Sequence, residues 1–118
     1  MSRSPSRVTA LAVGGVLLLV GALGFTANAE DWLFGILSVN PTQNLLHLVI
    51  GAALLAVAFV GRAPLFAALI GTLLLAIGIA GLFIINTPAN VIAVNGAANL
   101  LHFACAAVLL AVGLGARR

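Results

Sequence analysis

Hydrophobic residues in this chain run in long blocks and do not alternate with polar ones. Residues 8–29, 32–61 and 63–116 contain no Asp, Glu, Lys or Arg. A membrane-spanning helix needs about 20 apolar residues to cross about 30 Å of hydrocarbon. The first two blocks are each long enough for one span, and the third is long enough for two.

Breaks within and between these blocks predict four helices. They cover about 8–27, 41–61, 63–85 and 96–115. Gly61 and Pro64 mark a tight connector, because Gly commonly ends a helix and Pro is tolerated in the first turn of the next. Asn40 and Asn95 stand where N-caps would, and Gln43 occupies the capping-box position. The predicted fold is a single all-α domain over residues 1–118.

The composition decides what surrounds these helices. Hydrophobic residues make up 64% of the 118 residues and charged residues only 6%, whereas a soluble domain carries roughly 25% charged residues. A surface this poor in charge indicates a membrane four-helix bundle with the lipid bilayer as its partner. The five Arg residues lie only near the chain ends and in one connector, so no basic patch for nucleic acid is expected.

The charges also predict an orientation. Four spans place both termini and the Arg62 connector on one side, with every Arg, and leave Glu30 and Asp31 on the other. The positive-inside rule then puts both termini in the cytoplasm. An alternative is a cleaved signal peptide, because Ala27 and Ala29 form an A-x-A site before Glu30. Cleavage there would leave three spans.

Two segments repeat the same polar residues. Residues 39–47 read VNPTQNLLH, and residues 94–102 read VNGAANLLH. Over 39–57 and 94–112, 11 of 19 positions are identical at an offset of 55. The chain is therefore predicted to be a parallel duplication of a two-helix hairpin, with repeat 1 at about 8–61 and repeat 2 at about 63–115.

Glycines of the first and third helices align in the same way, at an offset of 57. Two-span repeats insert with the same orientation, so a pseudo-two-fold axis along the membrane normal is expected. Small residues let helices approach closely in lipid. The glycines assigned to helix packing are Gly14, Gly21, Gly24, Gly51, Gly71, Gly78 and Gly81.

The repeated Asn and His residues are the main candidates for a site. Asn44 precedes His47 by three positions, and Asn99 precedes His102 by three, so each pair shares a helical face. Ionisable groups in a membrane are unfavourable when they face lipid, so both His residues should face the bundle. We expect interhelical hydrogen-bond clasps. Their members are Asn40, Asn44, His47, Asn95, Asn99 and His102.

Three other interpretations stay open for His47 and His102. The first is a bis-His haem or metal site, with each Asn orienting its neighbouring His. Zinc is disfavoured because only Cys105 adds a soft ligand, and the absence of C-x-x-C-H argues against attached c-type haem. The second is a site for a small ligand, a lipid headgroup or a proton. The third is pH sensing, given an ordinary His pKa of about 6.5.

Enzymatic chemistry has little support. Glu30 and Asp31 are adjacent in a surface loop and form a poor acid–base pair. A Cys105–His102 nucleophile is disfavoured because an apolar setting opposes the thiolate. Trp32 and Phe34 are expected to anchor the protein at the membrane–water interface on the extracytoplasmic side.

The repeated Asn-x-x-His, together with Leu33–Gly35 (LFG) before the first copy, resembles a family of small four-span actinobacterial membrane proteins, domain of unknown function 4383. The resemblance covers about residues 8–115. Asn44, His47 and Gly51 match the family pattern Asn-x-x-His-x-x-x-Gly, whereas Ala106 replaces the glycine in the second copy. The family implies a bacterial cytoplasmic membrane and no specific activity. We therefore expect a non-enzymatic module that packs with itself or with a larger membrane complex.

Overall fold

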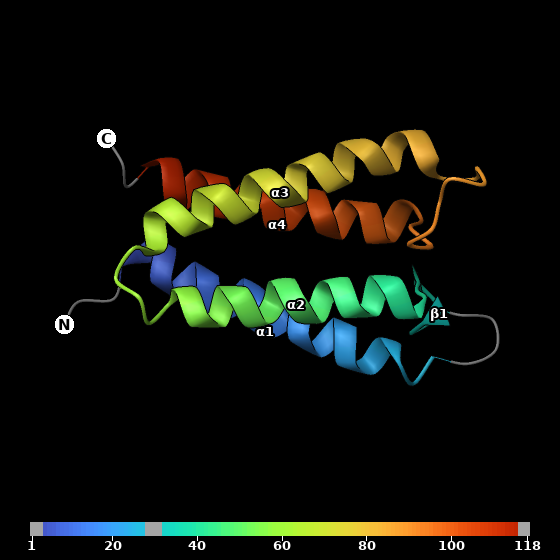
Figure 1. Cartoon of the computed structure of the whole chain (residues 1–118), viewed down its shortest axis with the longest axis horizontal. Coiled ribbons are helices and arrows are strands. Elements are labelled where there is room, and N and C mark those ends of the chain that lie inside the picture. Colours follow the sequence, from blue (N-terminus) through green and yellow to red (C-terminus); the bar gives the residue numbers. More distant parts are fainter. Residues whose placement is uncertain (1–3, 28–31, 116–118) are drawn as a thin grey trace.

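The computed structural model describes residues 4–27 and 32–115, and within them the chain forms four helices and one short β-hairpin. The elements are α1 (Pro5–Gly24), β1 (Trp32–Leu33), β2 (Leu37–Ser38), α2 (Pro41–Val57), α3 (Ala63–Ile84) and α4 (Gly96–Gly115). Helix α1 packs along α2, and α3 packs along α4, so two helical hairpins form two layers (Figure 1). The predicted all-α four-helix bundle is confirmed.

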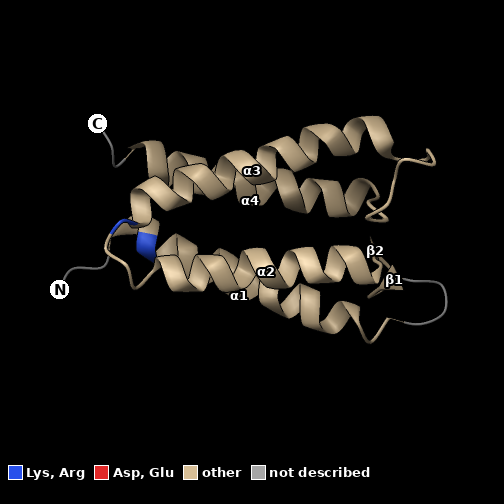
Figure 2. Ribbon diagram, viewed as in Figure 1, with Lys and Arg blue, Asp and Glu red and all other residues tan. Residues whose placement is uncertain are grey.

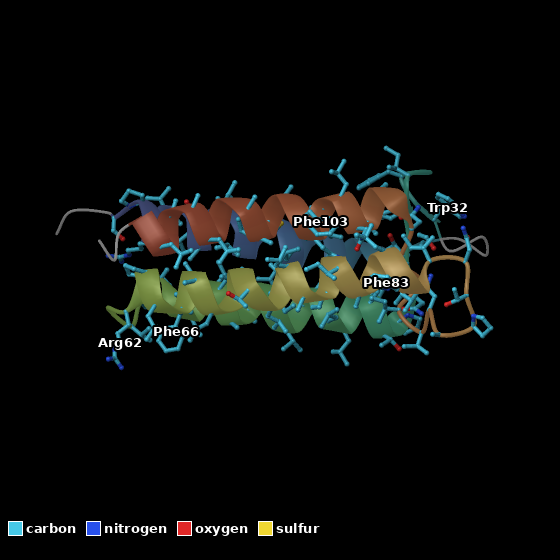
Figure 3. The ribbon with its side chains drawn as sticks, turned by 90° about the horizontal axis from the view of Figure 1, so that it is seen from above. Trp32, Arg62, Phe66, Phe83 and Phe103 are labelled. Atoms are coloured by element: carbon cyan, nitrogen blue, oxygen red, sulfur yellow. The ribbon has the colours of Figure 1, made fainter. Side chains whose placement is uncertain are left out.

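The bundle has two distinct ends. The start of α1, the end of α4 and the α2–α3 connector lie at one end, here called the terminal end (Figure 1). The β-hairpin and the connector of residues 85–95 lie at the other, here called the loop end. Both described Arg residues, Arg7 and Arg62, are at the terminal end (Figure 2). Figure 3 shows the labelled Trp32 at the loop end, opposite Arg62.

Two helices differ from their predicted bounds. Helix α1 begins at Pro5, because the Ser4 hydroxyl accepts a hydrogen bond from the Arg7 N–H at 3.1 Å, and it ends at Gly24 rather than residue 27. Helix α2 ends at Val57 rather than residue 61, where the chain tightens into i to i+3 bonds. Helices α1, α3 and α4 are long and apolar enough to cross a membrane, and α2, with 17 residues, is shorter.

Asn side chains begin α2 and α4. Asn40 Oδ1 accepts from the Gln43 N–H at 2.8 Å, and Asn95 Oδ1 accepts from the Ala98 N–H at 2.9 Å. The capping box expected of Gln43 is wrong. Its Nε2 donates to the Ser38 carbonyl at 2.8 Å and so ties β2 to α2.

The β-hairpin before α2 was not predicted. Trp32 pairs with Ser38, and Leu33 pairs with Leu37, in antiparallel register. The turn between the strands places Phe34 and Gly35 at φ values of 57° and 69°. Two successive residues at positive φ are typical of a type I′ turn, which suits a tight hairpin. The only local sign of this turn in the sequence is Gly35, because Gly adopts positive φ angles easily.

Four leucines, one from each helix, fill the centre of the bundle. Leu17, Leu54, Leu74 and Leu109 are all fully buried. Leu17 and Leu74 are separated by 57 positions, and Leu54 and Leu109 by 55, the same offsets that align the two halves of the sequence. Lipid is as apolar as leucine, so in a bilayer this layer stabilises the bundle through close packing rather than through removal from water.

Glycine contacts bring the helices of each hairpin together. A Cβ placed on Gly51 would lie 2.8 Å from the Gly14 carbonyl oxygen and 2.7 Å from the Leu18 nitrogen. In the second hairpin, the tightest approach to backbone atoms is at Gly113, where a Cβ would lie 2.7 Å from the Ala68 nitrogen. Sequence reasoning missed Gly113, although it lies seven positions after Ala106 and therefore on the same helical face.

Candidate functional site

The two histidines meet at the centre of the bundle, near the loop end. His47 lies in the second turn of α2 and His102 in the second turn of α4, and they are 1% and 0% exposed. Their Nε2 atoms are 3.1 Å apart, and their ring planes cross at 60°. Along their described lengths, α2 and α4 bring no pair of Cα atoms within 8 Å of each other. The histidine side chains therefore bridge helices whose backbones stay apart.

The 3.1 Å distance determines how protons can be arranged in this pair. One Nε2 must carry a hydrogen and donate it, and the other must present its lone pair. The accepting His is then neutral and carries its proton on Nδ1. The donating His can be neutral or cationic, so the pair can hold no charge or one positive charge, but not two. Both Nδ1 atoms are buried and have no hydrogen-bond partner in the described structure.

The neighbouring Asn side chains point elsewhere. Asn99 Nδ2 donates to the Gly78 carbonyl at 2.9 Å, within the second hairpin. A Cβ on Gly81 would collide with the Asn99 amide, and a Cβ on Gly24 would collide with the Asn44 amide. Each Asn therefore lies against the first helix of its own hairpin, while each His reaches across to the other hairpin.

This arrangement corrects one expectation. Neither Asn44 nor Asn99 is hydrogen-bonded to a histidine in the described structure, so they do not orient His47 and His102. The Asn and His of each pair point in different directions, because residues three positions apart differ by about 60° around the helix axis. The clasp expected from the sequence consists of the His–His contact and a separate Asn–glycine contact in each hairpin.

Several buried oxygens in the same layer have no hydrogen-bond partner among residues 4–27 and 32–115. They are Gln43 Oε1, Asn44 Oδ1 and Asn99 Oδ1. Unpaired polar atoms are unfavourable in an apolar interior. Together with the two Nδ1 atoms they form a layer of polar atoms with free hydrogen-bonding capacity at the loop end. Of the buried polar side chains among the described residues, all but Ser6 belong to this layer.

The N-cap asparagines add a second link between the hairpins. Asn40 Nδ2 donates to the Val91 carbonyl at 2.8 Å, and Asn95 Nδ2 donates to the Ile36 carbonyl at 3.0 Å. Each cap thus uses its oxygen for its own helix and its nitrogen for the opposite connector. Sequence reasoning identified the caps but missed this exchange, since the carbonyls that accept belong to distant loops.

The remaining candidates lie apart from this layer or outside the described residues. Cys105 is buried in the apolar core as a free thiol. Glu30 and Asp31 lie outside the described residues. Among the residues that are described, no group of three or more His, Cys, Asp or Glu side chains is placed to hold a metal ion. Trp32 and Phe34 are 43% and 72% exposed at the loop end.

Comparison with known families agrees with the repeated motif. The family model described as "Domain of unknown function (DUF4383)" matches residues 7–115. The chain belongs to this family. Neither the search of curated proteins nor the search of solved structures returned a match. Family membership, combined with three helices long enough to span, fits a membrane protein of the DUF4383 family and assigns no activity to it.

Proposed function

We propose that this DUF4383 protein is a small, non-enzymatic, four-span module of a bacterial cytoplasmic membrane, with both termini in the cytoplasm. Its terminal end carries Arg7 and Arg62, and its loop end contains the buried polar layer. Helix α2 is the shortest span, and the β-hairpin lies beside its start. Partners for such a module are a second copy or a larger membrane complex.

The observation that carries this proposal is the buried contact between His47 and His102. It joins α2 to α4, whose backbones do not approach each other. A hydrogen bond between membrane helices contributes about 0.5–2 kcal/mol. We infer that the pair is a clasp that holds the two hairpins in register at the loop end.

A double-mutant cycle on the purified full-length chain in detergent tests the clasp. His47→Phe, His102→Phe and the double variant are compared by thermal unfolding. Leu45→Ala and Leu100→Ala serve as controls, because these equivalent leucines are 58% and 69% exposed on the same helices. If the pair is a clasp, the two histidine substitutions should show a favourable coupling free energy. Additive effects of the two substitutions would contradict the clasp.

A test of topology is separate from the test of the clasp. In the proposed orientation, a green fluorescent protein fused after Arg118 fluoresces, and alkaline phosphatase fused there stays inactive. The reverse result would place the C-terminus outside the cytoplasm. Fusions after Ala89, in the connector between α3 and α4, should give the opposite pattern.

Metal binding by His47 and His102 is a second candidate. Two imidazole nitrogens at about 2.0–2.1 Å from one tetrahedral ion lie about 3.3 Å apart, near the 3.1 Å between the Nε2 atoms. A haem would require a wider separation, because its iron lies in line between the two nitrogens. Two protein ligands leave the other positions to water or a second copy.

Metal analysis and an absorption spectrum distinguish the two candidates. A bound ion or a haem Soret band that disappears in His47→Ala and His102→Ala would favour the cofactor site. A metal-free, colourless protein whose stability still depends on both histidines would favour the clasp.

A further inference from the structure

A second polar feature lies at the terminal end, beyond the opposite end of α2 from His47. A cavity of about 330 Å³ opens between the start of α1, the end of α2 and the start of α3. Its lining includes Ser4, Arg7, Phe59, Gly61, Ala63 and Pro64. Arg7 is the only charged side chain among the residues that line it.

The guanidinium of Arg7 contacts an aromatic ring and has no acidic partner among the described residues. It lies 5.7 Å from the centre of the Phe59 ring, in a cation–π contact. A cation–π contact does not use up the five guanidinium N–H donors, which can still bind an anion. The only acidic residues of the chain are Glu30 and Asp31, and in the sequence they follow the opposite end of α1.

The start of α3 also borders the cavity, and of its two lining residues only Ala63 has a backbone N–H, since Pro64 has none. Arg62, at its N-cap position, makes no side-chain capping bond, and Ala63 and Pro64 line the cavity. The first N–H groups of a helix need partners from outside it, and the positive end of the helix dipole favours an anion there. Helix α1 differs, because Ser4 already caps it.

We propose that this cavity binds a phosphate group, held by the guanidinium of Arg7 beside the uncapped start of α3. The position rests on the proposed membrane topology, which puts the cavity at the cytoplasmic surface, where anionic phospholipid headgroups are concentrated. Basic pockets between helices on that side bind such headgroups. The expected ligand is therefore the phosphodiester of an anionic phospholipid, and free phosphate shares the same chemistry.

Native mass spectrometry of the full-length chain tests this, with phosphatidylglycerol and phosphatidylcholine as probes. Wild type should prefer phosphatidylglycerol, and Arg7→Gln should weaken that binding roughly fivefold. Arg62→Gln is the matched control, because Arg62 is exposed and does not line the cavity. It removes the same charge and should change the affinity less than twofold.

Phe59→Ala provides a second variant that does not threaten folding, since Phe59 is 73% exposed. Without the ring, the guanidinium loses its support, and phosphatidylglycerol binding should weaken about two- to fivefold. Excess inorganic phosphate separates the two sources of ligand. Displacement of the lipid by phosphate would show that the cavity accepts the free anion, and resistance would show that it requires the lipid.

Two results would overturn the inference: equal binding of both lipids by wild type, or equal losses in Arg7→Gln and Arg62→Gln. Fractionation of cells keeps this separate from the proposed function. A protein found in the membrane without the Arg7 effect loses only the phosphate site, whereas a protein absent from the membrane loses the proposed topology as well.

Discussion

Asn99 lies directly against Gly81, and its Nδ2 donates to the Gly78 carbonyl oxygen at 2.9 Å. A side chain at position 81 would occupy the space of the amide. Gly24 and Asn44 make the corresponding contact between α1 and α2. Close packing of an amide against a bare helix backbone is therefore a shared property of the two hairpins.

We expect Gly81→Ala to lower the free energy of unfolding by about 1–3 kcal/mol, because its methyl group forces the Asn99 amide away from Gly78. Thermal unfolding in detergent measures the change. Gly15→Ala is the control, since a Cβ at Gly15 meets nothing within 4 Å. Equal effects of the two substitutions would show that the amide contact contributes nothing.

Gly113 makes the tightest approach to the backbone of the neighbouring helix between α3 and α4. A Cβ there would lie 2.7 Å from the Ala68 nitrogen and 2.8 Å from the Pro64 carbonyl oxygen, both backbone atoms that have little freedom to move. Gly113→Ala should therefore separate the helices at the terminal end and lower the melting temperature. Gly115→Ala has open space and should leave it unchanged. A neutral Gly113→Ala would mean that α3 shifts without loss of stability.

Asn95 offers a way to separate its cap from its bond to the other hairpin. Asn95→Asp keeps the oxygen that accepts from Ala98 but loses the donor to Ile36, whereas Asn95→Ala loses both. We expect Asn95→Ala to cost about 1–2 kcal/mol. Asn95→Asp should cost part of that, as measured by denaturant unfolding.

Amide hydrogen exchange of the β-hairpin tests the bond between Asn95 and Ile36 directly. In both Asn95 variants, the amides of the β-hairpin should exchange faster than in wild type. A wild-type exchange rate in Asn95→Asp would show that the bond to Ile36 does not order the hairpin. Asn40 and Val91 allow the reciprocal experiment from the other side.

The His pair predicts a coupling free energy of about 0.5–2 kcal/mol between His47→Phe and His102→Phe. The sign follows from the contact, because removal of one imidazole leaves the other Nε2 buried without a partner. The double variant removes both polar groups and should be more stable than the sum of the single effects implies. Strict additivity would contradict the direct contact.

Much of the fold was predictable from the chain alone. Block length gave the helices their number and approximate position, because a bilayer sets how many apolar residues a span needs. The caps at Asn40 and Asn95 were also predictable, since a cap depends on residues within one turn. Helix ends were less accurate: residues 58–61 are apolar enough to continue α2, yet the connector to α3 turns the chain there.

The partners of the polar side chains depend on tertiary structure. Spacing placed Asn44 and His47 on one face, and only the arrangement of the four helices sent His47 to α4 and Asn44 to α1. The bond between Asn95 and Ile36 likewise joins residues 59 positions apart. No local rule selects such a partner.

The sequence by itself determined an apolar four-helix chain with a repeated Asn–His motif, because apolar length, capping and repetition are properties of neighbouring residues. Tertiary structure alone decided that His47 meets His102, that Gly113 lies against the α3 backbone, and that Arg7 lines a cavity beside α3. The physical reason is that these features depend on how helices cross and rotate against one another, which follows from the packing of all four together.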